Sequence, residues 1–170
     1  EFSDEIVGGR IPREYIPSVE HAIRVESRKG QVAGYEVVDF KARLVDGKFH
    51  DVDSSALAFE IAGKGAFREA HRGSRPKLLE PIMGVEVVTE SEFLGDIIGD
   101  VNRRRGTVSE QGQKGLQSFV QGQVPLSEMF GYINFLRSAT RGRGTFTMEF
   151  DNYAEVPASM VDKLMEKEAK

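Results

Sequence analysis

The sequence predicts an α+β protein in two parts, a βαβα portion followed by a ferredoxin-like βαββαβ domain. Three observations support this expectation. The 170 residues are 39% hydrophobic and contain no long apolar run, as in a folded, soluble chain with one large or two small domains. Residues 73–76, Gly-Ser-Arg-Pro, separate a helical pattern from a strand pattern and favour an extended linker. Beyond them, alternating and helical patterns follow one another in βαββαβ order.

The first part, residues 1–76, contains two strand patterns and two helical patterns. Val19, Ala22 and Ile23 form an apolar stripe at helical spacing, and Asp53 is expected to cap the second helix. The expected elements are a strand over 1–7, a loop over 8–12, a helix from about Pro17, a strand over 38–44 and a helix over 53–71. Because small isolated sheets are marginal and two helices need more strands to cover them, we expect further strands before Glu1.

The second part, residues 77–155, alternates between strand and helix patterns. Ile97 and Val101 lie on one face at helical spacing, and residues 145–150 alternate with Phe and Met side chains on one face. The expected elements are a strand over 78–89, a helix over 93–105, hairpin strands over 107–110 and 116–124, a helix after Pro125 that includes Leu136, and a strand over 145–150. The C-terminal tail over 156–170 is expected to be helical.

Composition and missing motifs exclude several classes of function. The 23 basic and 27 acidic residues give a net charge of -4, so a sheet of positive charge for long duplexes is not expected. The absence of cysteine excludes a disulfide scaffold, a thiolate metal site and a cysteine nucleophile, and fits a cytoplasmic or organelle-matrix protein. No GxxxxGK[ST] loop occurs, so nucleotide hydrolysis is not expected of this chain. The histidines lack metal-ligand spacing, and we therefore expect no metal site.

The segment 50–55, His-Asp-Val-Asp-Ser-Ser, places a histidine beside two carboxylates. Such a group could hold a metal ion or form a general acid/base pair. A simpler explanation is that Asp53 caps a helix, where its carboxylate accepts backbone N–H bonds and contributes about 1 kcal/mol. His50 and Asp51 would then lie at an exposed loop tip. Exposed tips contact partners more often than they perform chemistry, because nothing there excludes water.

Two arginine clusters stand at the C-terminal ends of expected helices. One is the run 103–105, and the other comprises Arg137, Arg141 and Arg143. Arginine at a helix C-terminus complements the helix dipole. Three adjacent arginines are more than a helix dipole requires. In the second cluster, the interleaved glycines would expose backbone N–H groups to a phosphate. The pattern alone is equally compatible with helix capping and with contact to an RNA backbone.

Several motifs occur in order along nearly the whole chain. They are Ile6-Val-Gly-Gly-Arg-Ile-Pro-Arg-Glu-Tyr-Ile-Pro17, Ala33-Gly-Tyr35, His50-Asp-Val-Asp-Ser-Ser55 with Ala58-Phe59, Leu78-Leu-Glu-Pro-Ile-Met83, Arg104-Arg-Gly106, and Val124-Pro-Leu-Ser-Glu-Met-Phe-Gly-Tyr132 with Leu136-Arg-Ser138. Together they resemble the elongation factor G family, the translational GTPases that drive ribosomal translocation. Matches this long and ordered are specific.

The resemblance implies a fold and a set of contacts for each part. Residues 1–76 correspond to most of domain IV, an incomplete ribosomal-protein-S5-like fold, and residues 77–155 correspond to the ferredoxin-like domain V. In the family, the tip of domain IV enters the decoding centre behind the tRNA, and domain V lies against rRNA of the large subunit. The residues implied at the tip are Gly8, Gly9, Arg10, Lys48, Phe49, His50, Asp51 and Val52, and those implied to face rRNA are Arg137, Ser138, Thr140, Arg141 and Arg143.

The resemblance also implies what this chain lacks. GTP and Mg belong to the G domain of the full-length parent, so no catalytic residue, cofactor or metal is expected here. The implied partners are ribosomal RNA of both subunits, tRNA, mRNA and domains I to III of the parent, with no membrane, and the chain is expected to be a monomer. One departure from the family is Ala56, which stands where Glu is usual and removes the N3 partner of a capping box.

Two further classes of function remain open at this point. One is a stand-alone ferredoxin-like RNA-binding domain or small enzyme, and the other is a ribosome-recycling or ribosomal-protection relative. Relatives of the second kind differ most at the domain IV tip, which here is of the translocase type. The strand pattern that starts at Glu1 with nothing before it favours part of a longer translocase over a stand-alone domain.

Overall fold

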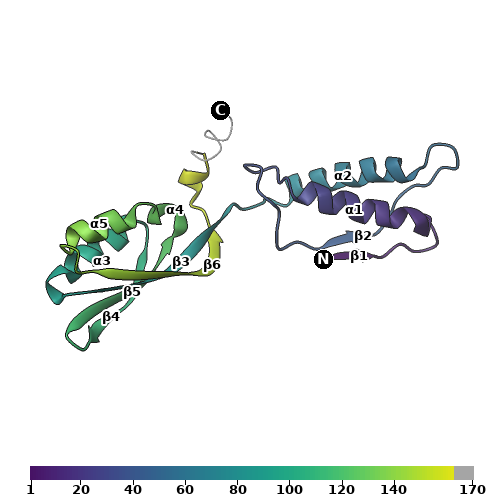
Figure 1. The fold of residues 1–170 in the computed structure, drawn as a ribbon. Coiled ribbons are helices and arrows are strands. Elements are labelled where there is room, and N and C mark those ends of the chain that lie inside the picture. The colour runs from purple at the N-terminus through teal and green to yellow at the C-terminus, as the bar shows by residue number, and fades with distance from the viewer. Residues whose placement is uncertain (163–170) are drawn as a thin grey trace. The chain divides into compact units, whose positions relative to one another are not determined.

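The computed structural model describes residues 1–162 and divides into two compact units (Figure 1). The N-terminal unit comprises Glu1–Lys77, and the C-terminal unit comprises Leu78–Pro157. Each unit has its own hydrophobic cluster. Residues 158–162 are helical, and the rest of the tail for which a helix is expected lies outside the described residues.

The N-terminal unit consists of two helices packed on a short parallel sheet. Its elements are β1 (Phe2–Asp4), the 3-10 helix η1 (Arg13–Tyr15), α1 (Ile16–Ser27), β2 (Ala42–Leu44) and α2 (Ala56–Gly73). The strands pair in parallel, with Phe2 opposite Ala42. Gly63 lets the helices approach closely, because a Cβ there would lie 3.2 Å from the Cβ of Ala22. The predicted βαβα order is confirmed.

Both strands of this unit are shorter than predicted. The strand expected over 38–44 begins only at Ala42, because Asp39 has φ 55° and leaves the β region, and Val38 is exposed. The strand expected over 1–7 ends at Asp4, whose Oδ1 accepts the backbone N–H of Ile6 at 3.0 Å. An Asp side chain that bonds to the backbone two residues on is a turn signal, which ends the strand.

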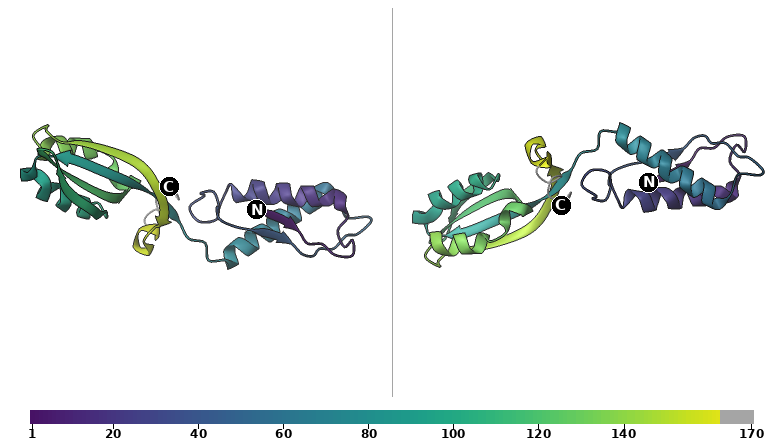
Figure 2. Two further views of the ribbon diagram at one scale, coloured as in Figure 1. Left: turned by 90° about the horizontal axis from the view of Figure 1, so that it is seen from below. Right: turned by 90° about the horizontal axis from the view of Figure 1, so that it is seen from above.

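The C-terminal unit has the predicted ferredoxin-like βαββαβ order. Its elements are β3 (Leu79–Thr89), η2 (Ser91–Phe93), α3 (Leu94–Arg103), β4 (Thr107–Lys114), β5 (Gln117–Pro125), α4 (Leu126–Met129), α5 (Tyr132–Ala139) and β6 (Thr145–Glu155). The strands form one antiparallel sheet in the order β4-β5-β3-β6. The helices of this unit lie on one face of its sheet, and none of them covers the other face (Figures 1 and 2).

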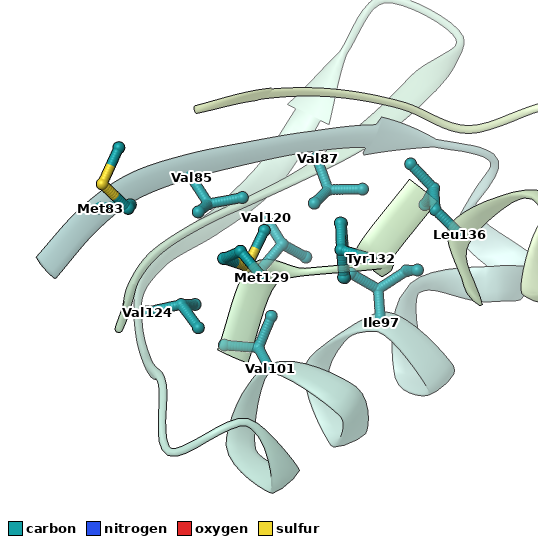
Figure 3. Close-up of a cluster of buried hydrophobic side chains, with 10 residues drawn as sticks. All are labelled: Met83, Val85, Val87, Ile97, Val101, Val120, Val124, Met129, Tyr132 and Leu136. Atoms are coloured by element: carbon teal, nitrogen blue, oxygen red, sulfur yellow. The ribbon is translucent and has the colours of Figure 1, made fainter. Parts of the chain in front are cut away.

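The core of this unit lies between the helices and the sheet (Figure 3). Ile97 and Leu136 are fully buried there. Tyr132 is buried too, with its ring edge-on to Phe146 at a centroid distance of 5.0 Å. Burial, reinforced by the nearby carboxylate of Asp100, raises the pKa of Tyr132 to about 12. The tyrosine therefore stays neutral at physiological pH and acts as a core residue.

The hairpin and the last strand are longer than predicted. Strand β4 continues to Lys114, so the turn shrinks from the expected 111–115 to Gly115, with φ 71°, and Leu116. Strand β6 runs on to Glu155, beyond the predicted end at residue 150. Strand β6 lies at the edge of the sheet and has a neighbour on one side only. Phe150 therefore remains 56% exposed, although its cross-strand partner Met83 is buried.

The single helix predicted after Pro125 is two helices. Phe130 adopts an extended conformation and Gly131 has φ 75°, which interrupts the helix between α4 and α5. The break redirects the chain so that Tyr132 and Leu136 are buried, while Ile133, which the helical pattern places on the buried face, is 38% exposed. A left-handed glycine can make this turn without the steric cost that a side chain would add.

Candidate nucleic-acid interface

Two loops of the N-terminal unit meet at one end of the domain. In the first, Gly8 and Gly9 have φ 73° and 68°, a conformation that favours glycine. The next residue, Arg10, donates from a guanidinium nitrogen to Oδ2 of Asp46 at 2.8 Å, in the turn that leads into the second loop. Hydrogen bonding to Arg10 lowers the pKa of Asp46. No sequence pattern indicates this link, because its partners stand 36 positions apart.

The two loops pack on the small hydrophobic core of the N-terminal unit. Ile11 is 3% exposed and packs on Gly47, where a Cβ would lie 2.8 Å from the Ile11 Cγ1. The ring of Tyr15 stacks with those of Phe49 and Phe59, at centroid distances of 6.0 and 4.9 Å. Phe49 thus packs one side of its ring on Tyr15, although the residue is 39% exposed. The loop backbone is held in place while the side chains beyond it remain in solvent.

The residues of the second loop beyond Phe49 are exposed. The side chain of His50 is 73% exposed, and its Nδ1 lies 3.8 Å from Oδ2 of Asp53. The backbone N–H of His50 donates to Ser54 Oγ at 2.9 Å, and the Ser54 N–H donates to the His50 carbonyl at 3.0 Å. These reciprocal bonds fix the turn without using the imidazole. The other exposed residues of the loop are Lys48, Asp51 and Val52.

The N-cap of α2 is Ser55, and the prediction that Asp53 caps this helix is wrong. Ser55 Oγ accepts the backbone N–H of Ala58 at 3.1 Å, and the side chain of Asp53 is 82% exposed. The N3 position is therefore Ala58, so the missing glutamate at Ala56 removes no capping-box partner. A serine followed by helix formers is an equally good cap signal, and the two neighbouring serines make the sequence ambiguous here.

The contact between Ile11 and Gly47 yields a test of how the loops are joined. We expect Gly47→Ala to destabilise the N-terminal unit by about 1–3 kcal/mol, because the new methyl group displaces a buried side chain. The matched control is Gly65→Ala in α2, where a Cβ meets nothing within 4 Å and should stabilise the helix by about 1 kcal/mol. Urea unfolding followed by amide resonances of the N-terminal unit measures both, and equal effects would contradict the packing described.

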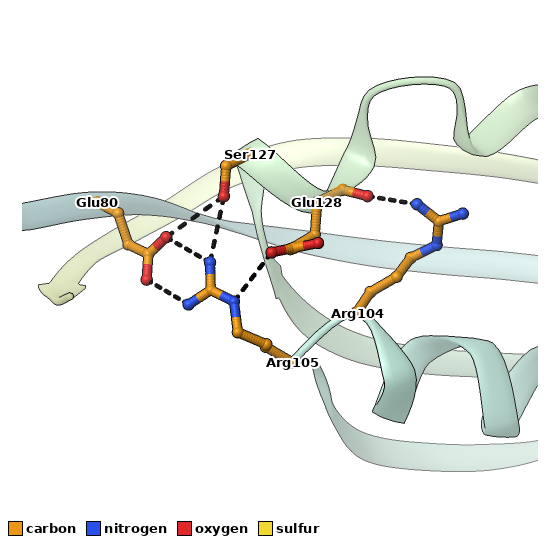
Figure 4. Close-up of polar contacts among 5 residues, drawn as sticks. All are labelled: Glu80, Arg104, Arg105, Ser127 and Glu128. Carbon is orange, nitrogen blue, oxygen red and sulfur yellow. Dashed lines mark hydrogen bonds and ion pairs between the residues drawn. The ribbon is translucent and has the colours of Figure 1, made fainter. Parts of the chain in front are cut away.

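The first arginine cluster is largely structural. The Arg105 guanidinium pairs with both carboxylate oxygens of Glu80 at 2.8 Å and with Glu128 at 3.0 Å (Figure 4). Arg104 contacts Asp100 at 2.6 Å and donates to the Glu128 carbonyl, and its guanidinium lies 5.1 Å from the Tyr132 ring centroid. Of the two alternatives that the sequence leaves open, RNA contact is therefore not supported for Arg104 and Arg105. Arg105 joins α4 to β3, and Arg104 joins α3 to α4.

The turn after α5 is closed by its own hydrogen bonds. The Gly142 N–H donates to the Arg137 carbonyl at 2.8 Å, and the Gly144 N–H donates to Thr140 Oγ1 at 2.9 Å. The expectation that glycines leave N–H groups free for phosphate is wrong for these two residues. Thr140 is fully buried, and its hydroxyl also donates to Leu136, so it does not face a partner as the resemblance implies. Because the N–H groups of these two glycines are already bonded, an anion at the turn after α5 must be bound by side chains.

Three of the residues implied to face rRNA are free to do so. Arg143 is not among them, because it contacts Glu90 at 2.6 Å, an ion pair that lowers the pKa of that carboxyl. Arg137 and Ser138 are exposed on α5, and Arg141 is exposed in the turn, with φ 52° and its guanidinium 5.9 Å from the Phe93 ring centroid. Among the described residues, neither Arg137 nor Arg141 has an ion-pair partner.

The described part of the chain offers neither a metal cluster nor a membrane-spanning helix. No group of three or more His, Asp or Glu side chains in residues 1–162 is arranged to hold a metal ion. Within the same residues, no helix has both the length and the apolar character needed to cross a membrane. His50 and Asp53 are a pair of exposed side chains and not part of a larger cluster.

Comparisons with known proteins agree with this architecture. The family model "Elongation factor G, domain IV" matches residues 1–75, and "Elongation factor G C-terminus" matches residues 77–164. Proteins named elongation factor G from Granulibacter bethesdensis and Gluconobacter oxydans are 54% and 52% identical over 168 residues, which is 99% of this chain and 24% of each relative. A crystal structure of a protein from Thermus thermophilus has a TM-score of 0.86 at 39% identity, covering 99% of this chain and 26% of that chain.

The two-domain fold and these matches define the C-terminal domains of a translation elongation factor. More specifically, the chain belongs to the elongation factor G family. It spans 24% of the length of the curated relatives described above.

Proposed function

We propose that this chain is the ribosome-engaging part of a translocating GTPase. In this proposal, the loop tip of the N-terminal unit contacts the tRNA and the decoding centre, and the turn after α5 contacts rRNA of the large subunit. The observation that carries the proposal is the pair Arg137 and Arg141, which stay exposed and without ion pairs among the described residues while the other arginines of the same unit are paired.

Free arginines on an acidic chain are suited to local contact with phosphate. A net charge of -4 opposes RNA at long range, so attraction must arise from patches that act within a Debye length of about 8 Å. Arginine binds phosphate through a planar fork of donors, and Ser138 offers a hydroxyl beside Arg137. Because the backbone of the turn is already satisfied, these side chains can change partner without any loss of fold.

The salt dependence of ribosome binding tests this role. We expect the double variant Arg137→Ala, Arg141→Ala of the full-length parent to bind ribosomes more weakly and to lower the slope of log K against log salt by roughly two units, since each lost phosphate contact removes about one. The melting temperature should change little, because arginine at a helix end contributes only about 0.3–1 kcal/mol.

The control for this experiment is Arg143→Ala, which removes an arginine that is already paired with Glu90. It should leave the salt slope nearly unchanged. An unaltered slope in the double variant together with a large drop in melting temperature would show that Arg137 and Arg141 are structural.

The loop tip of the N-terminal unit is proposed to contact RNA through base stacking and hydrogen bonds. The exposed His50 ring can donate or accept hydrogen bonds and stack on a base, while the turn beneath it is fixed by backbone and serine bonds. Lys48 adds positive charge on the second loop, while the charge of Arg10 on the first loop is paired with Asp46. These features suit contact with folded RNA, and they provide no water-excluding site for catalysis.

We further propose that the chain itself binds no GTP, since its sequence contains no phosphate-binding GxxxxGK[ST] loop. Isothermal titration calorimetry of GTP with Mg into the 170-residue chain should give no binding heat at micromolar concentrations. The full-length parent should bind under the same conditions, and micromolar binding by the chain alone would contradict the proposal.

A further inference from the structure

The sheet of the C-terminal unit has one face that no helix of the same unit covers (Figures 1 and 2). The register places Gly84 of β3 opposite Gln123 of β5 on one side and opposite Glu149 of β6 on the other. The buried Val85 and Val87 alternate with these residues and point to the core. We call this surface the open face; its polar side chains include Glu86, Glu110, Lys114, Gln121, Gln123, Thr147, Glu149 and Asp151.

A hollow of about 420 Å³ lies on the open face around Gly84. Residues of all four strands line it, among them Glu86, Gln121 and Glu149. A Cβ at Gly84 would meet only the Glu149 carbonyl oxygen, at 3.9 Å. Glycine at the centre of a strand weakens a sheet, and one common reason for it is the close approach of another group. The hollow can therefore accept a side chain from outside the unit.

The open face is strongly acidic. Four carboxylates, those of Glu86, Glu110, Glu149 and Asp151, face one lysine, Lys114, whose Nζ lies 3.9 Å from Glu86. The amide of Gln121 donates to Glu86 at 2.6 Å and holds that carboxylate at the hollow. Glu110 and Glu149 are exposed and have no ion-pair partner among the described residues. Their charge is thus available to a cationic partner.

RNA does not fit this surface. Single-stranded RNA bound to a sheet needs positive charge along the backbone and aromatic rings on which bases can stack. On the central strands the one aromatic ring that shares this face, Phe119, packs against Gly112, where a Cβ would lie 2.9 Å from its ring. The free arginines Arg137 and Arg141 belong to the helix layer of the unit. The two layers therefore differ in the class of partner that they can bind.

We propose that the open face docks a basic segment of a protein partner, with one arginine or lysine side chain inserted in the hollow at Gly84. The cation lies between the carboxylates of Glu86 and Glu149, and the glutamine amides contribute neutral hydrogen bonds around it. Glu110 and Asp151 attract further basic residues of the same segment. This inference does not depend on RNA contact by Arg137 and Arg141, because it concerns the opposite layer of the unit.

The test uses the 170-residue chain and a fluorescein-labelled decapeptide of alternating arginine and threonine. Anisotropy gives the affinity, and amide chemical shifts locate the site, which should comprise Gly84, Glu86, Gln121 and Glu149. Glu149→Lys should weaken binding about fivefold or more, since it replaces an attraction with a repulsion of similar size. Gly84→Val should weaken binding by filling the hollow, and Gly84→Ala is a milder version that preserves the fold.

The matched control is Asp96→Lys, the same change of charge at an exposed position of α3. It should alter peptide affinity by less than about twofold, as expected for a screened charge distant from the site. Equal weakening by Asp96→Lys and Glu149→Lys would mean attraction to overall charge and would overturn the proposal. Shifts on the open face caused by a ten-nucleotide adenine RNA, or peptide binding unaffected by both Gly84 variants, would overturn it as well.

Discussion

Replacing His50 by alanine in the full-length parent should slow translocation by about tenfold or more and leave the rate of GTP hydrolysis unchanged. The expected size follows from the loss of one stacking or hydrogen-bond contact with nucleotide, worth about 1–3 kcal/mol, where about 1.36 kcal/mol is tenfold in rate. The His50 ring is 73% exposed and supports no other residue of the turn, whose bonds come from the backbone and from Ser54. Stability should therefore change by less than about 0.5 kcal/mol.

Rapid-kinetic measurement of both steps on the same ribosome preparation checks this prediction. Glu69→Ala is the control, because Glu69 is an exposed residue of the same unit that pairs only with Arg72 among the described residues. It should affect neither step. If hydrolysis fell in parallel with translocation in the His50 variant, the role assigned to the tip would be incorrect.

Ile97→Ala should have the largest effect on stability, a loss of about 2–5 kcal/mol for the C-terminal unit. Ile97 is fully buried between α3 and the sheet, so truncation leaves a cavity in the cluster that also contains Val120 and Leu136 (Figure 3). A loss of this size is a large part of the about 5–15 kcal/mol that stabilises a typical domain.

Chemical denaturation of the 170-residue chain, read from amide resonances of each unit, measures this effect. Ile133→Ala removes the same atoms from a side chain that is 38% exposed and should cost far less. The N-terminal unit should retain its own midpoint in both variants. Equal losses from the two substitutions would contradict the core assigned to this unit.

The ferredoxin-like order of the C-terminal unit could be predicted because its signals are long. Strand β3 alternates buried Val85, Val87 and Thr89 with less buried neighbours over its whole length, and α3 buries Ile97 and Val101 at helical spacing. Patterns of this length leave few alternatives. The N-terminal strands have only three residues each, and their limits depend on the left-handed Asp39 and on a hydrogen bond of Asp4, neither of which periodicity reveals.

The candidate site could be predicted only in part. Residue type and position near turns indicate exposed loop residues such as His50 and Arg141. Burial of Thr140 and the pairing of Arg143 with Glu90 depend on long-range packing, since the two members of the ion pair stand 53 positions apart. The same holds for Arg105, which belongs to a basic cluster in the sequence but contacts Glu80 and Glu128 in the fold. One-dimensional patterns do not reveal which charges neutralise one another.

The absence of cysteine in this chain permits a direct measurement of the central claim, that its tip and the turn after α5 contact RNA in different parts of the ribosome. Single cysteines placed by His50→Cys or Arg141→Cys, in a full-length parent without other cysteines, can carry a tethered iron chelate that cleaves nearby RNA. Position 50 should direct cleavage to the decoding region of small-subunit rRNA and to tRNA, and position 141 should direct it to large-subunit rRNA. Cleavage of the same RNA from both positions, or of no RNA from either, would contradict the account.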